Sequence, residues 1–289
     1  MEIIILGSAG CTTIPRPTCQ CKICKEAREK GIPYSRSGSS IFLKEINAIF
    51  DTPEEIKNQL NRENILKVDN IFYTHWHPDH TLGLRVIEEM NLYWLAEYIE
   101  NKKPEKKVNV YALPDVMKDL LAIRNRFSPY LEYYKKKELV NLVELKNKQG
   151  IVRKRIKITP ILVKPTPLEN STVYVLEHND KKLIYAPCDV KPFPESELLK
   201  NAEILIIGGV VPDEPLKDNY FIPEENPLKA ELYSIKDLIR IKERLRIRNL
   251  IITHIEEEWG KSFDDYKKLE QKYKKHDIRF AFDGMKIKL

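Results

Sequence analysis

The chain has 289 residues, of which 42% are hydrophobic and 32% are charged. Its apolar runs are shorter than the roughly 18 residues that a membrane helix needs, so we expect no contact with a membrane. Recurring aliphatic runs exclude a collagen, a coiled coil and a disordered chain. The 49 Lys and Arg residues exceed the 43 Asp and Glu residues slightly, for a net charge of +6. This excess slightly favours an anionic ligand and does not by itself indicate nucleic-acid binding.

Short apolar runs that end at glycine or polar residues predict buried strands, and apolar residues three or four apart predict helices. In the first half of the chain, strands are expected at Glu2–Leu6, Ser39–Leu43, Ala48–Asp51, Asn70–Thr74 and Val108–Ala112. Helices are expected at Pro53–Asn61, Leu82–Ile99 and Asp115–Phe127. The second of these helices offers an apolar stripe that ends at Leu95 and Ile99.

The second half of the chain repeats this pattern. Strands are expected at Ile156–Val163, Ser171–Glu177, Lys182–Ala186, Ile204–Ile207, Asn249–Thr253 and Ile278–Ala281. Helices are expected at Glu195–Leu199, Ser234–Arg244 and Asp264–Lys274. Two β-rich halves, each closed by helices, predict an α/β fold in which two packed sheets lie between outer helices, a four-layer αββα sandwich. We expect a single domain over residues 1–289, with a Cys-rich loop at 11–34 and a helical insertion at about 84–140.

A dense group of potential metal ligands follows the strand expected at Asn70–Thr74. Three of the chain's six histidines and one aspartate fall within six residues, which chance makes improbable: His75, His77, Asp79 and His80. In an extended segment His75 and His77 point to the same side, and Asp79 and His80 stand where a helix begins. One ion can therefore take the first two side chains, and a second ion the other two. Imidazole and carboxylate ligands suit zinc, and also manganese or iron.

The pattern His-x-His-x-Asp-His after a buried strand resembles the metal motif of the metallo-β-lactamase superfamily. The resemblance implies the αββα sandwich and further ligands at later strand ends. Asp189 matches the aspartate that bridges two ions, and His254 matches the last histidine ligand. A carboxylate placed in this way orients a metal-bound hydroxide as well as holding the metal, so Asp79 and Asp189 are the expected catalytic residues.

One histidine of the superfamily pattern is missing. The superfamily usually places it after the strand that corresponds to Ile158–Val163, where this chain has Lys164–Pro167 and no histidine. The first site would keep His75, His77 and Asp189, and the second would keep Asp79, His80, Asp189 and His254. Glu169 or a water molecule is a candidate for the missing ligand, and the number of ions, one or two, stays open. Cys188, beside Asp189, is interpreted as buried packing.

A second group of potential ligands lies near the N-terminus. Cys19, Cys21 and Cys24 offer three thiols on a short loop, so that one zinc ion can collect three of its four ligands there. The first residues show no signal-peptide features, which predicts a cytoplasmic, reducing location and favours metal binding over disulfides.

This cysteine loop resembles one branch of the superfamily, which contains the phosphoribosyl cyclic phosphodiesterase of phosphonate breakdown and the B-type proteins of pyrroloquinoline-quinone biosynthesis. In the phosphodiesterase, a histidine three residues after the last active-site histidine completes the structural zinc site. The resemblance therefore implies Glu257 as the fourth ligand here, with Cys11 as the second candidate.

These resemblances imply a metal-dependent hydrolase. We expect a phosphodiesterase that uses metal-activated water on a small cyclic or linear phosphodiester, with one or two zinc ions (or manganese or iron) and one structural zinc. The alternatives are an iron-dependent biosynthetic oxidoreductase, an RNA-processing nuclease and a binding protein with a degenerate site. The expected partner is a small anionic phosphoester, and nucleic acid is a possible but less favoured partner. The proton donor and the oligomeric state stay open, a homodimer included.

Overall fold

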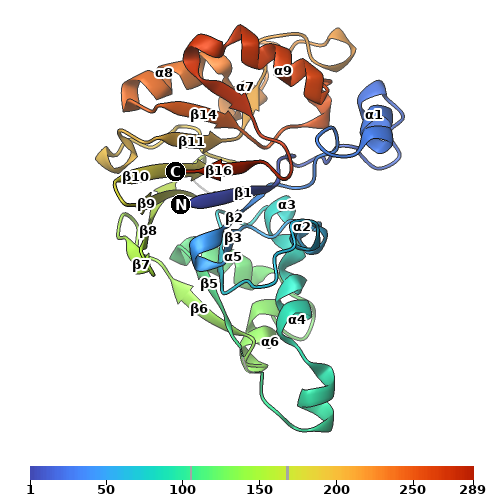
Figure 1. The fold of residues 1–289 in the computed structure, drawn as a ribbon, viewed down its shortest axis with the longest axis vertical. Coiled ribbons are helices and arrows are strands. Elements are labelled where there is room, and N and C mark those ends of the chain that lie inside the picture. Colours follow the sequence, from blue (N-terminus) through green and yellow to red (C-terminus); the bar gives the residue numbers. More distant parts are fainter. Residues whose placement is uncertain (105, 167–168) are drawn as a thin grey trace.

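Two seven-stranded sheets pack face to face and helices cover both outer sides (Figure 1). The computed structural model describes residues 1–104, 106–166 and 169–289. In order across it, the first sheet contains β16 (Lys286–Lys288), β1 (Glu2–Gly7), β2 (Ser40–Leu43), β3 (Ala48–Phe50), β4 (Asn70–Phe72), β5 (Val108–Ala112) and β6 (Val140–Glu144). The second contains β15 (Ile278–Phe280), β14 (Asn249–Ile252), β11 (Ile204–Ile207), β10 (Lys181–Ala186), β9 (Ser171–His178), β8 (Ile156–Val163) and β7 (Ile151–Arg153). The predicted four-layer αββα sandwich is confirmed.

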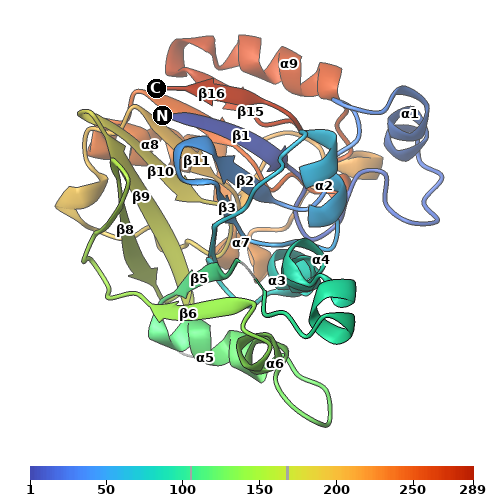
Figure 2. The ribbon, with the colours of Figure 1, turned by 60° about the horizontal axis from the view of Figure 1, so that its bottom comes forward.

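The helices flank the two sheets on opposite sides (Figure 2). Those of the first half are α1 (Lys22–Lys30), α2 (Ile56–Arg62), α3 (Pro78–Thr81), α4 (Val86–Asn91), α5 (Pro114–Ala122) and α6 (Tyr130–Lys136). Those of the second half are α7 (Leu228–Glu231), α8 (Ile235–Leu245) and α9 (Phe263–Lys272). A small additional sheet pairs β12 (Val210–Val211) with β13 (Tyr233–Ser234). None of the described helices is long and apolar enough to span a membrane.

The alternation of side chains along β10 explains how one strand serves two hydrophobic cores. Successive side chains of a strand point to opposite faces of the sheet. Leu183 and Tyr185 therefore pack in the core between the two sheets. Ile184 and Ala186 pack on the other face, in the core that the second sheet shares with α8 and α9. All four side chains are buried, which explains why the strand has a continuous apolar sequence.

The strands that matter for function run parallel to their neighbours. In the first sheet β3, β4, β5 and β6 are parallel, and in the second β10, β11, β14 and β15 are parallel. The carboxyl ends of parallel strands lie at one edge of a sheet, which is where open α/β sheets bind ligands. The chain segments that follow β4, β10 and β14 therefore leave their sheets at such edges.

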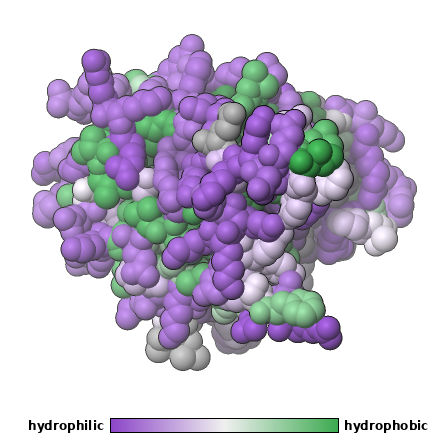
Figure 3. Space-filling model, turned by 90° about the horizontal axis from the view of Figure 1, so that it is seen from below, coloured by the Kyte–Doolittle hydropathy of each residue, from purple (hydrophilic) through white to green (hydrophobic). Residues whose placement is uncertain are grey.

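The longest predicted helix is not continuous in the structure. The segment expected as one helix at Leu82–Ile99 is broken into a 3₁₀ turn at Leu82–Arg85, α4 and a π turn at Leu95–Ile99. Leu95 and Ile99 are 48% and 67% exposed, so the expected apolar stripe does not continue past α4. Seen from below, the surface is mostly hydrophilic with separate hydrophobic patches (Figure 3).

Other predicted boundaries also change. The segment expected as a helical insertion at 84–140 contains β5, which lies within the first sheet, and it runs up to the start of β6. The Cys-rich loop at 11–34 contains α1, and the helix expected at Glu195–Leu199 is a short 3₁₀ turn. Strands β6, β7 and β16 were not predicted, because each lies at a sheet edge and contains only a short apolar run.

A buried carboxylate holds the end of β1 in place. The Asp283 carboxylate accepts hydrogen bonds from the Ser8 amide (2.9 Å) and hydroxyl (2.8 Å) and from the Ser37 amide (2.9 Å) and hydroxyl (2.6 Å). Its side chain is 2% exposed, and this burial raises its pKa despite those hydrogen bonds. The Ser8 carbonyl in turn accepts from the Ile255 amide (2.9 Å), next to His254. Asp283 therefore stabilises the loop on which the His254 segment rests.

We expect Asp283→Asn to lower the free energy of unfolding by about 2–3 kcal/mol, because an amide NH₂ would face buried donors that now meet an acceptor. Urea unfolding followed by circular dichroism measures this loss. Asp180→Asn, at an exposed hairpin turn, is the matched control and should change stability by less than about 0.5 kcal/mol. Equal stability of the two variants would contradict the role given to Asp283.

Candidate metal centre

The loop after β4 carries the predicted ligands His75 and His77, and α3 carries Asp79 and His80. Pro78 is the first residue of α3, where its fixed φ suits a helix and its missing N–H costs nothing. The Thr81 hydroxyl closes the turn by donating to the carbonyls of Trp76 and His77, both at 3.0 Å. The sharp change from strand to helix turns Asp79 and His80 toward the same edge as His75.

The first metal group consists of His75, His77 and Asp189. The Asp189 Oδ2 lies 3.4 Å from His75 Nε2 and 3.1 Å from His77 Nδ1. His75 is buried, and its Nε2 has no hydrogen-bond partner within the described part of the chain. A buried polar nitrogen without a partner is costly. This nitrogen therefore fits a metal ion as its missing partner.

The second metal group consists of Asp79, His80 and His254. The Asp79 Oδ2 lies 3.3 Å from His80 Nε2 and 3.2 Å from His254 Nε2, and the two imidazole nitrogens are 3.2 Å apart. A tetrahedral zinc ion with ligands at ~2.1 Å separates them by roughly 3.4 Å. These three atoms thus stand close to the positions that a single ion requires.

A second layer of side chains orients the imidazoles of both groups. The buried Asp51 carboxylate contacts His80 Nδ1 at 2.8 Å and accepts from the Thr74 amide (2.7 Å) and hydroxyl (2.8 Å). The Thr74 hydroxyl also contacts His75 Nδ1 at 2.9 Å. Partners of this kind fix the ring and leave Nε2 for a metal. Sequence reasoning missed this role of Asp51, although a carboxylate that ends an apolar strand was a usable signal.

The corresponding partner of His254 is Glu256. Its Oε1 lies 3.4 Å from His254 Nδ1, and the carboxylate accepts from the amides of Cys11 (3.0 Å) and Thr12 (2.9 Å). This residue also was missed, because its contact with the loop after β1 arises only in the folded chain. Glu256 therefore ties the last histidine of the site to the start of the cysteine loop.

Cys188 is buried, as predicted, and its sulfur also lies among the potential ligand atoms. Its Sγ lies within 4.8 Å of the ligand atoms of His75, His77 and Asp189, and it also groups with His80 and His254. Burial raises the pKa of the thiol, but interaction with His254 and hydrogen bonds to the surrounding imidazoles lower it well below its ordinary value. Cys188 thus belongs to the site.

The predicted structural site is assembled around Glu257. The Glu257 Oε1 lies 2.9 Å from Cys21 Sγ and 3.5 Å from the Sγ atoms of Cys19 and Cys24. Cys21 and Cys24 stand one turn apart because α1 begins directly after Cys21. The carboxylate is fully buried and Lys217 Nζ lies 2.6 Å from it. Burial raises its pKa, but hydrogen bonds from Cys21 and Lys217 lower it to about 2.

This arrangement favours Glu257 over Cys11 as the fourth ligand of that site. Cys11 is exposed and lies outside the group formed by the other four residues. We call Cys19, Cys21, Cys24 and Glu257 the cysteine cluster. Three thiols and a carboxylate form a closed tetrahedral ligand set, which is typical of a structural zinc rather than a catalytic one.

The alternative ligand predicted for the first metal group lies outside that group. Glu169 accepts from the Thr166 hydroxyl on the loop after β8 and belongs to no ligand group found among the described residues. Pro167, in the segment where the superfamily histidine is missing, lies outside the described residues.

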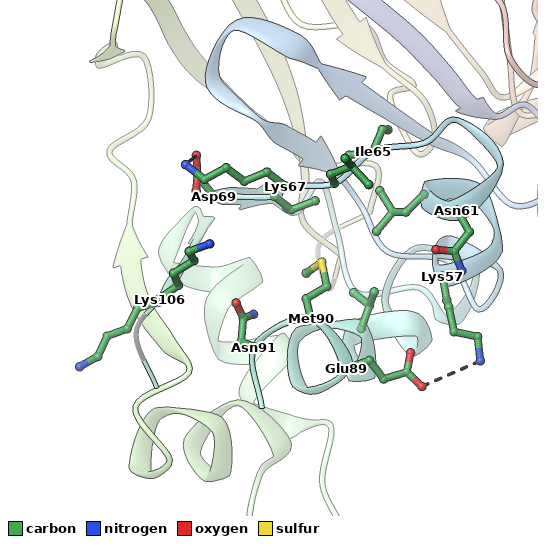
Figure 4. Close-up of a pocket in the computed structure, with 14 residues that line it drawn as sticks. Lys57, Asn61, Ile65, Lys67, Asp69, Glu89, Met90, Asn91 and Lys106 are labelled. Atoms are coloured by element: carbon green, nitrogen blue, oxygen red, sulfur yellow. Dashed lines mark ion pairs between the residues drawn. The ribbon is translucent and has the colours of Figure 1, made fainter. Parts of the chain in front are cut away.

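A separate pocket of about 380 Å³ lies between α2, α4 and the residues that precede β4 (Figure 4). Asp69 lines it just before β4 begins, whereas His75 follows the end of that strand. Its lining mixes lysines with acids, including an ion pair of Lys57 with Glu89 at 3.9 Å. The pocket contains none of the candidate ligands, so it is not part of the metal centre.

An αββα sandwich with imidazoles and carboxylates gathered after β4, β10 and β14 defines the metallo-β-lactamase class of fold. The model of the beta-lactamase superfamily domain matches residues 46–255, and the chain belongs to this family. Membership supports metal-dependent hydrolysis as the general class of activity. Among the curated proteins, none matches the chain in sequence.

Solved structures share the fold over the whole chain. A diphosphatase of the PhnP family is 20% identical, with a TM-score of 0.73 and coverage of 100% of this chain and 97% of the other. Zinc-bound PqqB from Methylobacterium extorquens is 15% identical, with a TM-score of 0.73 and full coverage of both chains. The short form of human tRNase Z is 14% identical, with a TM-score of 0.63 and coverage of 100% and 99%. The predicted superfamily is thus confirmed.

We expect Asp51→Asn to weaken zinc binding at the centre by roughly 10- to 100-fold, the usual effect of removing an outer partner of a histidine ligand. Competition titration with a chromophoric chelator measures the affinity, and the cysteine cluster should keep its own ion. Asp180→Asn, remote from the site, is the control. Unchanged affinity in Asp51→Asn would remove Asp51 from the site.

Metal binding should release protons at neutral pH. Burial by itself lowers the pKa of both imidazoles. For His80, interaction with Asp51 and Asp79 outweighs burial and raises the pKa well above its ordinary value. For His254, interaction with Cys188, Asp79 and Glu256 has the same effect. An ion binds neutral imidazole and must displace these protons. The affinity for metal should therefore rise with pH and fall as the pH drops through these raised pKa values. Because they lie above the ordinary histidine pKa of about 6.5, the loss of affinity should already begin above that pH.

Isothermal titration with zinc, in buffers of different ionisation enthalpy, measures this proton release when the protein already carries zinc at the cysteine cluster and lacks only the active-site ion. His178→Ala should behave like the unchanged chain, because His178 contacts a backbone carbonyl at a hairpin. Binding that releases no protons at neutral pH would show that His80 and His254 are neutral before the ion arrives.

Proposed function

We propose that the chain is a metal-dependent phosphodiesterase that hydrolyses a small cyclic or linear phosphodiester. The observation that carries this proposal is the pair of ligand groups at one edge of the sandwich, with Asp189 in the first and Asp79 in the second. Bound metal ions at these groups would lower the pKa of water and neutralise the phosphoryl oxygens. The name of one structural neighbour, a diphosphatase, agrees with phosphate chemistry.

The exposure of the ligands indicates where a substrate enters. The side chains of His77, Asp189 and Asp79 are 30%, 25% and 15% exposed, whereas those of His75 and His80 are 2% and 0% exposed. The solvent-facing carboxylates therefore stand where an attacking water must lie. In the proposed mechanism, Asp189 and Asp79 accept hydrogen bonds from this water and hold it in line with phosphorus.

A neighbouring cavity suits the organic part of such a substrate. It has a volume of about 690 Å³ and is lined by Leu82, two residues after His80, and by Arg85, Phe127, Tyr130 and Tyr133. Aromatic walls bury an apolar group. The Arg85 guanidinium is paired with Glu89 at 2.8 Å. The cofactors we propose are one or two active-site ions, zinc or else manganese or iron, with one zinc at the cysteine cluster.

We expect His77→Ala to lower kcat/KM for bis(p-nitrophenyl) phosphate and for a cyclic phosphodiester by roughly 100- to 1,000-fold, which corresponds to about 3–4 kcal/mol of lost transition-state stabilisation. Adding Asp189→Ala should abolish the remaining cleavage, and removal of metal with a chelator should do the same. The control, His178→Ala, should retain full activity.

Two results would contradict the proposal. Cleavage that survives the double change of His77 and Asp189 would place hydrolysis elsewhere. Iron as the bound metal, with turnover of no ester, would favour the oxidoreductase instead. Metal analysis of anaerobically purified protein, beside a screen of cyclic and linear phosphodiesters, separates these outcomes.

A further inference from the structure

We infer that the Cys188 thiolate is a ligand of the active-site metal and supplies the donor that the missing histidine would have given. Cys188 follows the carboxyl end of β10 and stands next to Asp189. Its Sγ groups with His75, His77 and Asp189, and separately with His80 and His254. Among the described residues, it is the one side chain that belongs to both groups, so it lies between them.

The packing of Cys188 does not account for its position. The side chain is 8% exposed, yet it belongs to neither hydrophobic core, whereas its neighbours Ala186 and Val190 pack in the core beneath α8 and α9. Instead its sulfur faces imidazoles and lies 3.5 Å from Asp189 Oδ1. A buried sulfur surrounded by metal-ligand atoms is typical of a ligand rather than of apolar packing.

The ligand count supports the same conclusion. Without Cys188, the first metal group offers two imidazoles and one carboxylate, and it lacks the donor that the superfamily histidine would add. Glu169, the alternative donor predicted from the sequence, accepts a hydrogen bond from Thr166 and joins no ligand group among the described residues. The thiolate supplies this donor, and because a catalytic zinc can expand to five ligands, the first site still has a position for water. The place of Cys188 between the groups also allows it to bridge two ions.

A thiolate ligand changes which metal the centre prefers. Soft sulfur ligands favour zinc and iron, whereas manganese prefers oxygen donors. The inference therefore narrows the proposed cofactors to zinc or iron. It rests on the metal centre of the proposed function and not on the substrate.

Cadmium-113 NMR of the metal-free chain loaded with ¹¹³Cd²⁺ tests the inference, because its chemical shift moves downfield with each sulfur ligand. We expect one resonance from the three thiols of the cysteine cluster and a second at a shift that requires at least one sulfur. In Cys188→Ser the second resonance should move upfield while the first stays. Zinc affinity at the centre should fall by at least roughly 10- to 100-fold, the effect of losing an outer partner alone.

The matched control is Cys11→Ser, since Cys11 is exposed and outside both groups; it should leave both resonances unchanged. A centre resonance at a shift typical of nitrogen and oxygen ligands in the unchanged chain overturns the inference, whether or not Cys188→Ser folds. A sulfur-shifted resonance without phosphodiester cleavage retains the inference and overturns the proposed function. Phosphodiester cleavage together with a resonance typical of nitrogen and oxygen ligands retains the proposed function and overturns the inference.

Discussion

Imidazoles and carboxylates removed from water need partners, and this requirement governs the whole active edge of the molecule. The outer nitrogens find them in the fold: His80 contacts Asp51, His75 contacts Thr74, and His254 contacts Glu256. The inner atoms instead face one another across 3.1–3.4 Å. A cation is the one partner that satisfies acids and neutral imidazoles together.

The scaffold holds these groups because it is rigid immediately beneath them. Phe72, the last residue of β4, stacks between Phe50 and Tyr111 with ring centroids 4.9 and 4.5 Å apart. The Tyr174 hydroxyl of the second sheet donates to the Tyr73 carbonyl at 2.7 Å, two residues before His75. The two sheets are thus joined at the point where the ligands begin, and a site on rigid elements keeps its geometry.

The sequence allowed prediction of what depends on local pattern. His75, His77, Asp79 and His80 share one loop, and the apolar runs before Asp189 and His254 marked strand ends. The roles of Asp51, Glu256 and Cys188 depend on which strands become neighbours, and no local spacing encodes that. The break after α4 was missed for a related reason: Leu95 and Ile99 have helical spacing but nothing to pack against.

Glu257 follows His254 by three residues, so the cysteine cluster and the active-site metal groups share one short segment of backbone. Whatever occupies the thiols near the N-terminus also restrains the backbone that presents a catalytic-edge imidazole. If this restraint changes the metal affinity at His254, the active-site ion must change the affinity of the cysteine cluster by the same factor, because such linkage is reciprocal. In this view the Cys-rich loop near the N-terminus stabilises the position of His254 as well as holding its own ion.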